Sequence, residues 1–270
     1  MAKKRVDVLL VEQGLADSRQ KAQAIIMAGQ VYAGERRCDK AGLTLDEETA
    51  LEVRGQAMPY VSRGGLKLEK AMRSFPITLK DKIAADIGAS TGGFTDCMLK
   101  NGAVKVYAVD VGYGQLAWSI RNDPRVVCLE RTNARYLTRE QIPEALDFAS
   151  IDVSFISLGL ILPALRPLLK DGGEVAALVK PQFEAGREKV GKKGVVRDPA
   201  VHLEVLEQFL DHAAQSDFSV KGLDFSPIRG PEGNIEYLGY LRTGAGEGFA
   251  GDLKELVRCS HEILKGGGEA

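Results

Sequence analysis

Apolar runs alternate with helical stretches from Val61 onward, and this alternation restricts the fold more than any other feature of the chain. Strands are expected near residues 83–87, 104–109, 126–129, 146–151 and 174–179, with helices reaching residues 100 and 169 between them. This order is typical of an α/β protein with a doubly wound parallel sheet. The chain should close with a helix at 199–215, an antiparallel hairpin of strands at 219–226 and 234–241, and a last helix at 252–264.

The charge and composition of the chain exclude several classes of protein. The formal net charge is -1, so any basic surface that attracts nucleic acid must be local. The longest stretches without a charged residue, 22–34 and 153–165, have 13 residues each, which is too short to span a bilayer. The basic start, Met1–Arg5, precedes an apolar run too short for a signal peptide, so we expect a cytoplasmic protein.

The cysteines and histidines predict neither a metal site nor a nucleophile. The four cysteines lie at least 31 positions apart, and no C-x-x-C pair is present. None of the three histidines stands near a Ser or Cys in a recognisable nucleophile motif. We expect reduced structural thiols, no metal and a monomer.

The first forty residues form the only basic block at an end of the chain, with eight basic residues against five acidic ones. Helices are predicted at 6–14 and 17–29 and strands at 30–35 and 49–53, which together make a small α+β module. We therefore predict a small domain at 1–55, a linker at 56–61, a large domain at 62–264 and a disordered tail at 265–270.

Basic residues at the start of the second helix conflict with the helix dipole. Arg19 and Lys21 lie in its first turn, where a bound phosphate would remove the conflict, although a solvated basic face is the simpler interpretation. The runs 5–10, 14–22 and 28–32 resemble the S4 domain, an RNA-binding module, and this resemblance favours contact with RNA. The candidate RNA-binding residues are Lys3, Lys4, Arg5, Arg19, Lys21, Arg36 and Arg37.

A glycine-rich turn, Asp86-Ile-Gly-Ala-Ser-Thr-Gly-Gly-Phe-Thr, follows the first predicted strand of the large domain. Its glycines let the main chain approach a ligand closely. The spacing is not G-x-G-x-x-G and no Gly-Lys-Ser or Gly-Lys-Thr follows, so dinucleotide and P-loop sites are disfavoured. Taken alone, the turn is equally compatible with a purely structural connection.

Two later residues favour a nucleoside cofactor at this turn. Asp110 ends the next strand, 24 residues after Asp86, where its carboxylate can take the hydroxyls of a ribose, and Asn133 could reach an adenine edge. An exposed loop aspartate and a turn-forming asparagine are the alternatives. Together these features resemble the S-adenosylmethionine site of class I methyltransferases, which have a seven-stranded, mostly parallel sheet. The candidate cofactor-binding residues are Asp86, Gly88, Ala89, Ser90, Thr91, Gly92, Gly93, Phe94, Asp110, Val111, Asn133 and Asp152.

The segment after the strand at 146–151 restricts which atom can be methylated. Amino-group methyltransferases have two prolines and an aromatic residue after an Asn or Asp, whereas Val153 and Ser154 follow Asp152 here. Methylation of carbon 5 of a pyrimidine needs a cysteine near the ends of the fourth or fifth strand, and no cysteine lies there. Both reactions are therefore disfavoured.

Four charged residues point to a ribose oxygen instead. Lys180 closes an apolar strand, Glu236 lies on an apolar strand face, and Lys67 borders an apolar helix stripe. In chain order Lys67, Asp152, Lys180 and Glu236 match the K-D-K-E tetrad of FtsJ-like ribose 2′-O-methyltransferases, with Lys70 as a rival for the first lysine. Each residue alone could form a surface salt bridge.

The tetrad implies in-line attack of a ribose oxygen on the methyl group of a sulfonium, without a metal. A ribose hydroxyl is a poor nucleophile, so the site must remove its proton or stabilise the developing alkoxide. Lys180 is the candidate for either role, and the sequence leaves both open. Asp152 and Glu236 would orient the two amines.

Runs along nearly the whole chain resemble the TlyA (haemolysin A-like) family, namely 110–118, 122–126, 130–135, 154–158, 179–184 and 233–237. That family implies 2′-O-methylation of cytidine in ribosomal RNA, with large-subunit RNA as the favoured substrate and ribosomal subunits as partners. Tyr60 stands where better-known members have a tryptophan, which puts the linker's role in doubt. The alternatives are an RNA-binding assembly factor with little catalysis and a membrane-active haemolysin, for which no amphipathic or spanning element is visible.

Overall fold

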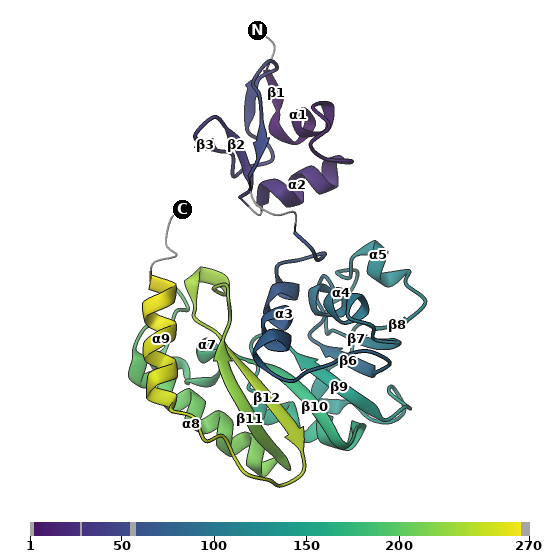
Figure 1. The fold of residues 1–270 in the computed structure, drawn as a ribbon, viewed down its shortest axis with the longest axis vertical. Helices are drawn as coiled ribbons and strands as arrows, with labels where there is room; N and C mark the ends of the chain where they lie inside the picture. The colour runs from purple at the N-terminus through teal and green to yellow at the C-terminus, as the bar shows by residue number, and fades with distance from the viewer. Residues whose placement is uncertain (1–2, 28, 55–57, 266–270) are drawn as a thin grey trace. The chain divides into compact units, whose positions relative to one another are not determined.

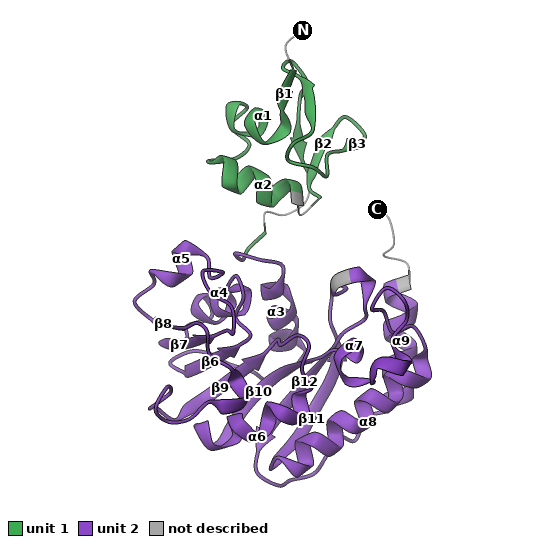
Figure 2. Ribbon diagram, turned by 180° about the vertical axis from the view of Figure 1, so that it is seen from behind, with its two compact units in different colours: residues 1–59 green, residues 60–270 purple. Residues whose placement is uncertain are grey.

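The computed structural model describes residues 3–27, 29–54 and 58–265 (Figure 1). The chain divides into two compact units, residues 1–59 and residues 60–270 (Figure 2). The predicted linker at 56–61 falls partly outside the described residues. So does the predicted tail, since α9 (Leu253–Lys265) includes its first residue and 266–270 are not described.

The first unit contains the two predicted helices and more strands than expected. Its elements are β1 (Lys3–Arg5), α1 (Val6–Glu12), α2 (Arg19–Met27), β2 (Val31–Ala33), β3 (Arg36–Arg37), β4 (Thr44–Asp46) and β5 (Glu52–Val53). β1 pairs with β4, and a second small sheet has the order β3-β2-β5. The Ser18 hydroxyl accepts the Lys21 N–H at 3.2 Å and so caps α2. Val6, Leu10 and Ile26 lie in its small buried core.

The second unit contains the predicted seven-stranded sheet. Its helices besides α9 are α3 (Gly64–Ser74), α4 (Gly93–Lys100), α5 (Trp118–Arg121), α6 (Leu162–Leu165), α7 (Pro181–Glu184) and α8 (Pro199–Gln215). Its strands are β6 (Ile83–Ile87), β7 (Lys105–Val109), β8 (Val126–Leu129), β9 (Leu146–Ile151), β10 (Leu169–Val179), β11 (Phe218–Phe225) and β12 (Tyr237–Thr243). The strand order is β11-β12-β10-β9-β6-β7-β8, and β12 alone runs in the direction opposite to the other six strands.

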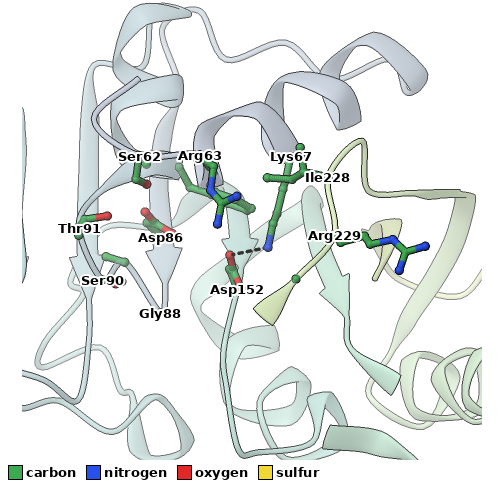
Figure 3. Close-up of a pocket in the computed structure, with 15 residues that line it drawn as sticks. Ser62, Arg63, Lys67, Asp86, Gly88, Ser90, Thr91, Asp152, Ile228 and Arg229 are labelled. Atoms are coloured by element: carbon green, nitrogen blue, oxygen red, sulfur yellow. Dashed lines mark ion pairs between the residues drawn. The ribbon is translucent and has the colours of Figure 1, made fainter. Parts of the chain in front are cut away.

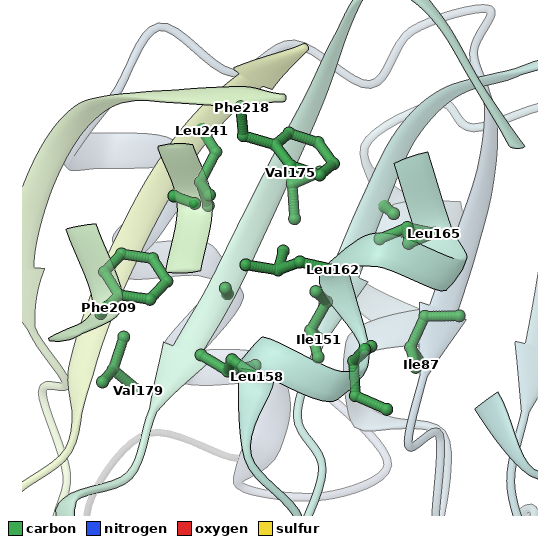
Figure 4. Close-up of a cluster of buried hydrophobic side chains, with 14 of the residues drawn as sticks. Ile87, Ile151, Leu158, Leu162, Leu165, Val175, Val179, Phe209, Phe218 and Leu241 are labelled. Carbon is green, nitrogen blue, oxygen red and sulfur yellow. The ribbon is translucent and has the colours of Figure 1, made fainter. Parts of the chain in front are cut away.

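Helices cover both faces of this sheet, as Figure 1 shows. Leu68 of α3 and Met98 of α4 belong to the core on one face. Leu162 of α6 and Phe209 of α8 belong to the core on the other face (Figure 4). Because both faces are covered, the parallel strands are mostly apolar, which produced the apolar runs of the sequence. Most polar groups of the site lie at or just after strand ends, with Lys67 added from α3.

Two predicted segments differ from the structure. The helix expected to reach residue 169 is broken into a 3-10 turn (Leu158–Leu160), α6 and a second 3-10 turn (Arg166–Leu168), because Pro163 and Pro167 cannot donate helical hydrogen bonds. The strand expected at 234–241 enters the ladder only at Tyr237. Glu236 therefore precedes β12 instead of lying within it.

Candidate active site

Two adjoining cavities open at the carboxyl ends of the parallel strands, where doubly wound sheets bind ligands. The first has a volume of about 470 Å³ and lies between the β6–α4 loop and the start of α3 (Figure 3). The second, of about 420 Å³, lies beside the ends of β7 and β8. Gly88, Ser90 and Asp152 line both cavities, so the two form one bipartite site.

Asp86 holds the glycine-rich loop in place. Its buried carboxylate accepts the N–H and O–H of Thr95 at 2.9 and 2.7 Å and the hydroxyl of Ser150 at 3.1 Å. Burial raises the pKa of Asp86 to about 6, although these hydrogen bonds act in the opposite direction. Because the Thr95 N–H lies in the first turn of α4, Asp86 fixes the point at which the loop becomes a helix.

Gly88 allows this loop to approach the end of β9. Its φ is +90°, and a Cβ there would lie 2.4 Å from the carbonyl oxygen of Asp152. Only glycine fits such a position, so Asp152 is brought directly against the loop. Gly92, with φ +91°, is the residue directly before α4 and lines neither cavity. It turns the chain from the loop into the helix.

The other predicted cofactor residues divide between the two cavities. The first is lined by Asp86, Gly88, Ala89, Ser90, Thr91, Gly93, Phe94 and Asp152, and the second by Asp110, Val111 and Asn133 together with the shared residues. Asp110 accepts the N–H groups of Ser90 and Gly112, each at 2.7 Å, which fixes its carboxylate at the cavity edge. Asn133 also caps a 3-10 turn by accepting the Arg135 N–H at 3.1 Å.

The structure brings together the four residues of the predicted tetrad. Lys67 Nζ lies 2.7 Å from Glu236 Oε2 and 3.8 Å from Asp152 Oδ2, and Lys180 Nζ lies 2.5 Å from Asp152 Oδ1. Figure 3 shows Lys67 reaching from α3 toward Asp152. Lys67, Lys180 and Glu236 are all buried. Asp152 therefore joins two ammonium groups at the mouth of the cavity, a cluster that burial would make unstable without paired charges.

Lys70 lies outside this cluster. It pairs with Asp224 at 2.9 Å and donates to the carbonyl of Phe225, near the end of β11. Lys70 lies three positions after Lys67, so its side chain is displaced along the axis of α3. Lys67 is therefore the lysine that reaches Asp152, and Lys70 reaches Asp224. The choice of Lys67 rests on the Ser62-Arg-Gly-Gly-Leu-Lys-Leu run, of which Ser62, Arg63, Gly64 and Lys67 line the first cavity.

Several lining residues were not predicted. They are Ser62, Arg63, Gly64, Ile228, Arg229 and Gly230 in the first cavity, and Val109, Gln115, Thr132, Ala134, Val153, Ser154, Phe155, Ile156 and Ile161 in the second. Most lie on loops, where no periodicity marks them. Phe155 is one of these residues. It lies in a chain segment rich in apolar residues, yet its side chain is 90% exposed. It has φ +64°, and its ring lies 4.9 Å from that of Phe183.

The basic residues of the first unit are more often paired than the sequence suggests. Arg5 and Arg19 both bind the buried Asp7, at 2.9 and 3.2 Å, and hydrogen bonds led by that from Arg5 hold the pKa of Asp7 well below its usual range. Lys21 pairs with Asp17 at 2.5 Å. The dipole conflict in α2 is thus relieved within the chain.

The remaining RNA-binding candidates differ in exposure and pairing. Lys4 pairs with Glu12 at 3.0 Å. Arg36 and Arg37 are exposed on β3, and Lys3 is exposed on β1. Within the described ranges, Lys3 and Arg36 form no ion pair.

Two further observations concern membranes and metals. No helix in the described part of the chain is long and apolar enough to cross a bilayer. Across residues 3–27, 29–54 and 58–265, no three His, Cys, Asp or Glu side chains are grouped so that they could hold a metal ion.

The sheet order, the glycine-rich loop after β6 and the carboxylate at the end of β7 define a class I methyltransferase. Residues 60–243 match the FtsJ-like methyltransferase family, and residues 4–51 match the S4 domain. The chain therefore belongs to the FtsJ-like methyltransferases. Its 46% identity with a TlyA protein over 97% of the chain places it, within them, in the TlyA (haemolysin A-like) family.

Three similar proteins illustrate this relationship. A protein of Bacillus subtilis named putative rRNA methyltransferase YqxC is 56% identical, covering 97% of this chain and 96% of its own. The 16S/23S rRNA (cytidine-2′-O)-methyltransferase TlyA of Mycobacterium tuberculosis is 46% identical, covering 97% and 98%. The solved structure of a putative hemolysin from Streptococcus thermophilus is 51% identical with a TM-score of 0.79, covering 99% and 98%.

Proposed function

We propose that this protein transfers a methyl group from S-adenosylmethionine to the 2′-oxygen of a ribose in ribosomal RNA, with cytidine as the nucleoside and large-subunit RNA as the substrate to test first. The observation that carries this proposal is the Lys67–Glu236 and Lys180–Asp152 pairing at the cavity mouth. The names of the two curated relatives support RNA as the substrate. We expect the chain to act as a monomer in the cytoplasm, where ribosomes are assembled.

The bipartite site suits the proposed cofactor. The Gly88 and Gly93 backbone gives close access to the first cavity for the methionine part. In the second cavity, Asp110 uses each carboxylate oxygen for one N–H and keeps lone pairs for two ribose hydroxyls. Asn133, exposed at the rim, has an amide NH₂ that can face an adenine edge. The bound cofactor would supply an electrophilic methyl group attached to a sulfonium.

Lys180 is the residue that would handle the proton of the attacking hydroxyl. It lies 2.5 Å from Asp152 and 3.2 Å from the Ser154 hydroxyl, so its Nζ is held at a fixed position beside the cavity mouth. Lys180 either takes the proton of the hydroxyl or stabilises the alkoxide that forms, and Asp152 holds its Nζ in place for both roles. Lys67, held by Glu236, adds a second positive charge that stabilises the developing alkoxide.

Phe155 offers a surface for the base of the target nucleotide. Its ring is exposed at the second cavity and packs against Phe183, which follows Lys180 by three positions. A nucleotide whose ribose reaches Lys180 must leave the RNA stack, and an exposed aromatic face compensates for lost stacking. Phe155 would therefore hold the extruded base while the 2′-oxygen faces the tetrad.

The experiment that tests the proposal is transfer of labelled methyl from S-adenosylmethionine to purified small and large ribosomal subunits from cells lacking this protein. Lys180→Ala serves as the comparison, with cofactor binding measured in both proteins. We expect label in large-subunit RNA with the wild type and at least about a hundredfold less with the variant. Label in neither subunit, despite cofactor binding, would reject ribosomal RNA as the substrate.

A further inference from the structure

A buried hydrogen-bond network joins the start of α8 to the segment that carries Glu236. His202 of α8 is fully buried, with Nε2 3.0 Å from the carbonyl oxygen of Val196 and Nδ1 2.8 Å from the hydroxyl of Tyr237. A carbonyl oxygen only accepts, so Nε2 carries the hydrogen and Nδ1 accepts from Tyr237. Burial lowers the pKa of His202, which favours this neutral form.

Asn234 completes the network from the other side. Its Oδ1 accepts the N–H of Val196 at 3.1 Å, and its Nδ2 donates to the carbonyl of Gly194 at 2.9 Å. Both main-chain polar groups of Val196 are therefore bound by side chains, those of His202 and Asn234. Val196 also packs in the same core as Tyr237. The loop before α8 is thus fixed to the chain segment before β12.

Glu236 lies inside the segment that this network holds. It is flanked by Asn234 and Tyr237, and its own carbonyl accepts the Ser226 N–H at 2.8 Å. Its carboxylate points away from the network, toward Lys67. The loop held by Asn234 and His202 begins after α7, and α7 directly follows Lys180. The network therefore ties the loop before α8 to the chain segment that supplies Glu236.

We propose that His202, Asn234 and Tyr237 are positioning residues for methyl transfer. Together they fix the position of Glu236, and Glu236 in turn fixes the position of the Lys67 amine. This inference rests on the function proposed above. The side chains of His202 and Tyr237 bond to each other, to Val196 and to Ser260 rather than to the tetrad, so they act through Glu236 and not on the substrate. A buried polar network permits one arrangement of its members, whereas apolar packing alone tolerates small shifts. Shifts near 1 Å at a catalytic group are large enough to reduce the rate.

Tyr240 provides a matched control on the same strand. Like Tyr237 it is buried and its hydroxyl forms a hydrogen bond, but its partner is Glu174 of β10, and its ring belongs to the core on the other face of the sheet. Tyr237→Phe and Tyr240→Phe thus remove the same atom from the same strand. Only the first breaks the link between His202 and the Glu236 segment.

The test compares kcat, KM and hydrogen exchange of the two full-length variants with those of the wild type. We expect Tyr237→Phe to lower kcat about tenfold with KM for S-adenosylmethionine within about twofold, whereas Tyr240→Phe keeps the wild-type kcat at a similar Tm. Exchange at 194–196 and 234–237 should accelerate in Tyr237→Phe alone. Equal kcat losses in both variants, or unchanged exchange in both segments, would overturn the proposal.

Variants of His202 keep the test decisive if Tyr237→Phe does not fold. An asparagine places an acceptor near the position of Nδ1, and a glutamine places a donor near that of Nε2. We expect His202→Asn to retain more of kcat than His202→Gln, because the link to Tyr237 is the one that continues to Glu236. The reverse order would refute the role assigned to Tyr237. Exchange is measured without substrate, so an inactive wild type would reject the proposed function while leaving this inference testable.

Discussion

Gly230 presses against the carboxylate of Glu236, so adding one methyl group there should displace that carboxylate. A Cβ at Gly230 would lie 2.1 Å from the Oε1 atom and 2.6 Å from the Cδ atom of Glu236. The φ of Gly230 is not in the left-handed region, so an alanine there leaves the backbone unstrained and the clash falls on Glu236. Restoring ordinary contact, which begins at about 3.4 Å, requires a movement of more than 1 Å, which would break the 2.7 Å contact between Glu236 and Lys67. We expect Gly230→Ala to destabilise the fold by about 1–3 kcal/mol through overpacking.

The effect on catalysis should exceed the effect on folding. A misplacement of this size typically costs about 10- to 100-fold in rate, and we expect that loss in kcat for methyl transfer. Gly248→Ala is the matched control, since a Cβ there meets nothing within 4 Å and its φ is also ordinary. The assay is single-turnover methyl transfer, with unfolding followed by urea titration. A wild-type rate in Gly230→Ala would refute the requirement for a fixed Glu236.

Three further outcomes follow from the site and from the first unit. The pKa of Asp86 is raised from 3.8 to about 6 in the folded protein, so the folded state favours the protonated carboxyl. The free energy of unfolding therefore falls as the pH rises through that window. Asp86→Asn should therefore be more stable than the wild type by about 1–3 kcal/mol near pH 7 and equal to it near pH 4; urea titration showing no such difference would contradict this. Asp110→Ala should raise the Kd for S-adenosylmethionine about tenfold by calorimetry, since Ser90 and Gly112 lose their acceptor; an unchanged Kd would remove Asp110 from the site. Reversing Lys3 and Arg36 to Glu should weaken binding to ribosomal RNA and make its salt dependence shallower by about two ion equivalents, whereas Lys254→Glu on α9 should not; equal effects would exclude the first unit as the interface.

The seven-stranded sheet and the grouping of the candidate residues at one edge could be predicted because their signals are independent of distant contacts. Buried parallel strands are apolar along their whole length, and each chemical group stands where such a run ends, as Asp86, Asp110, Asp152 and Lys180 do. The carboxyl ends of parallel strands meet at one edge, so sequence positions far apart predict one site.

The parts that were missed depend on tertiary contacts. The walls contributed by Arg63 and Ile228 belong to loops, which carry no periodic signal. The partners of Arg19 could not be inferred either, because Asp7 becomes a buried acceptor only when α1 and α2 pack together. A cationic first turn therefore suggested a bound phosphate where the structure has an internal carboxylate.

In the proposed mechanism Lys180 and Asp152 direct methylation to a ribose oxygen, and identifying the modified nucleoside tests this role. Large-subunit RNA treated with the wild-type protein and S-adenosylmethionine is digested to nucleosides and analysed by mass spectrometry, with Lys180→Ala in parallel. We expect 2′-O-methylcytidine, identified by loss of a methylated ribose on fragmentation, with the wild type and none with the variant. A methylated base, or a ribose product at undiminished yield with Lys180→Ala, would contradict it.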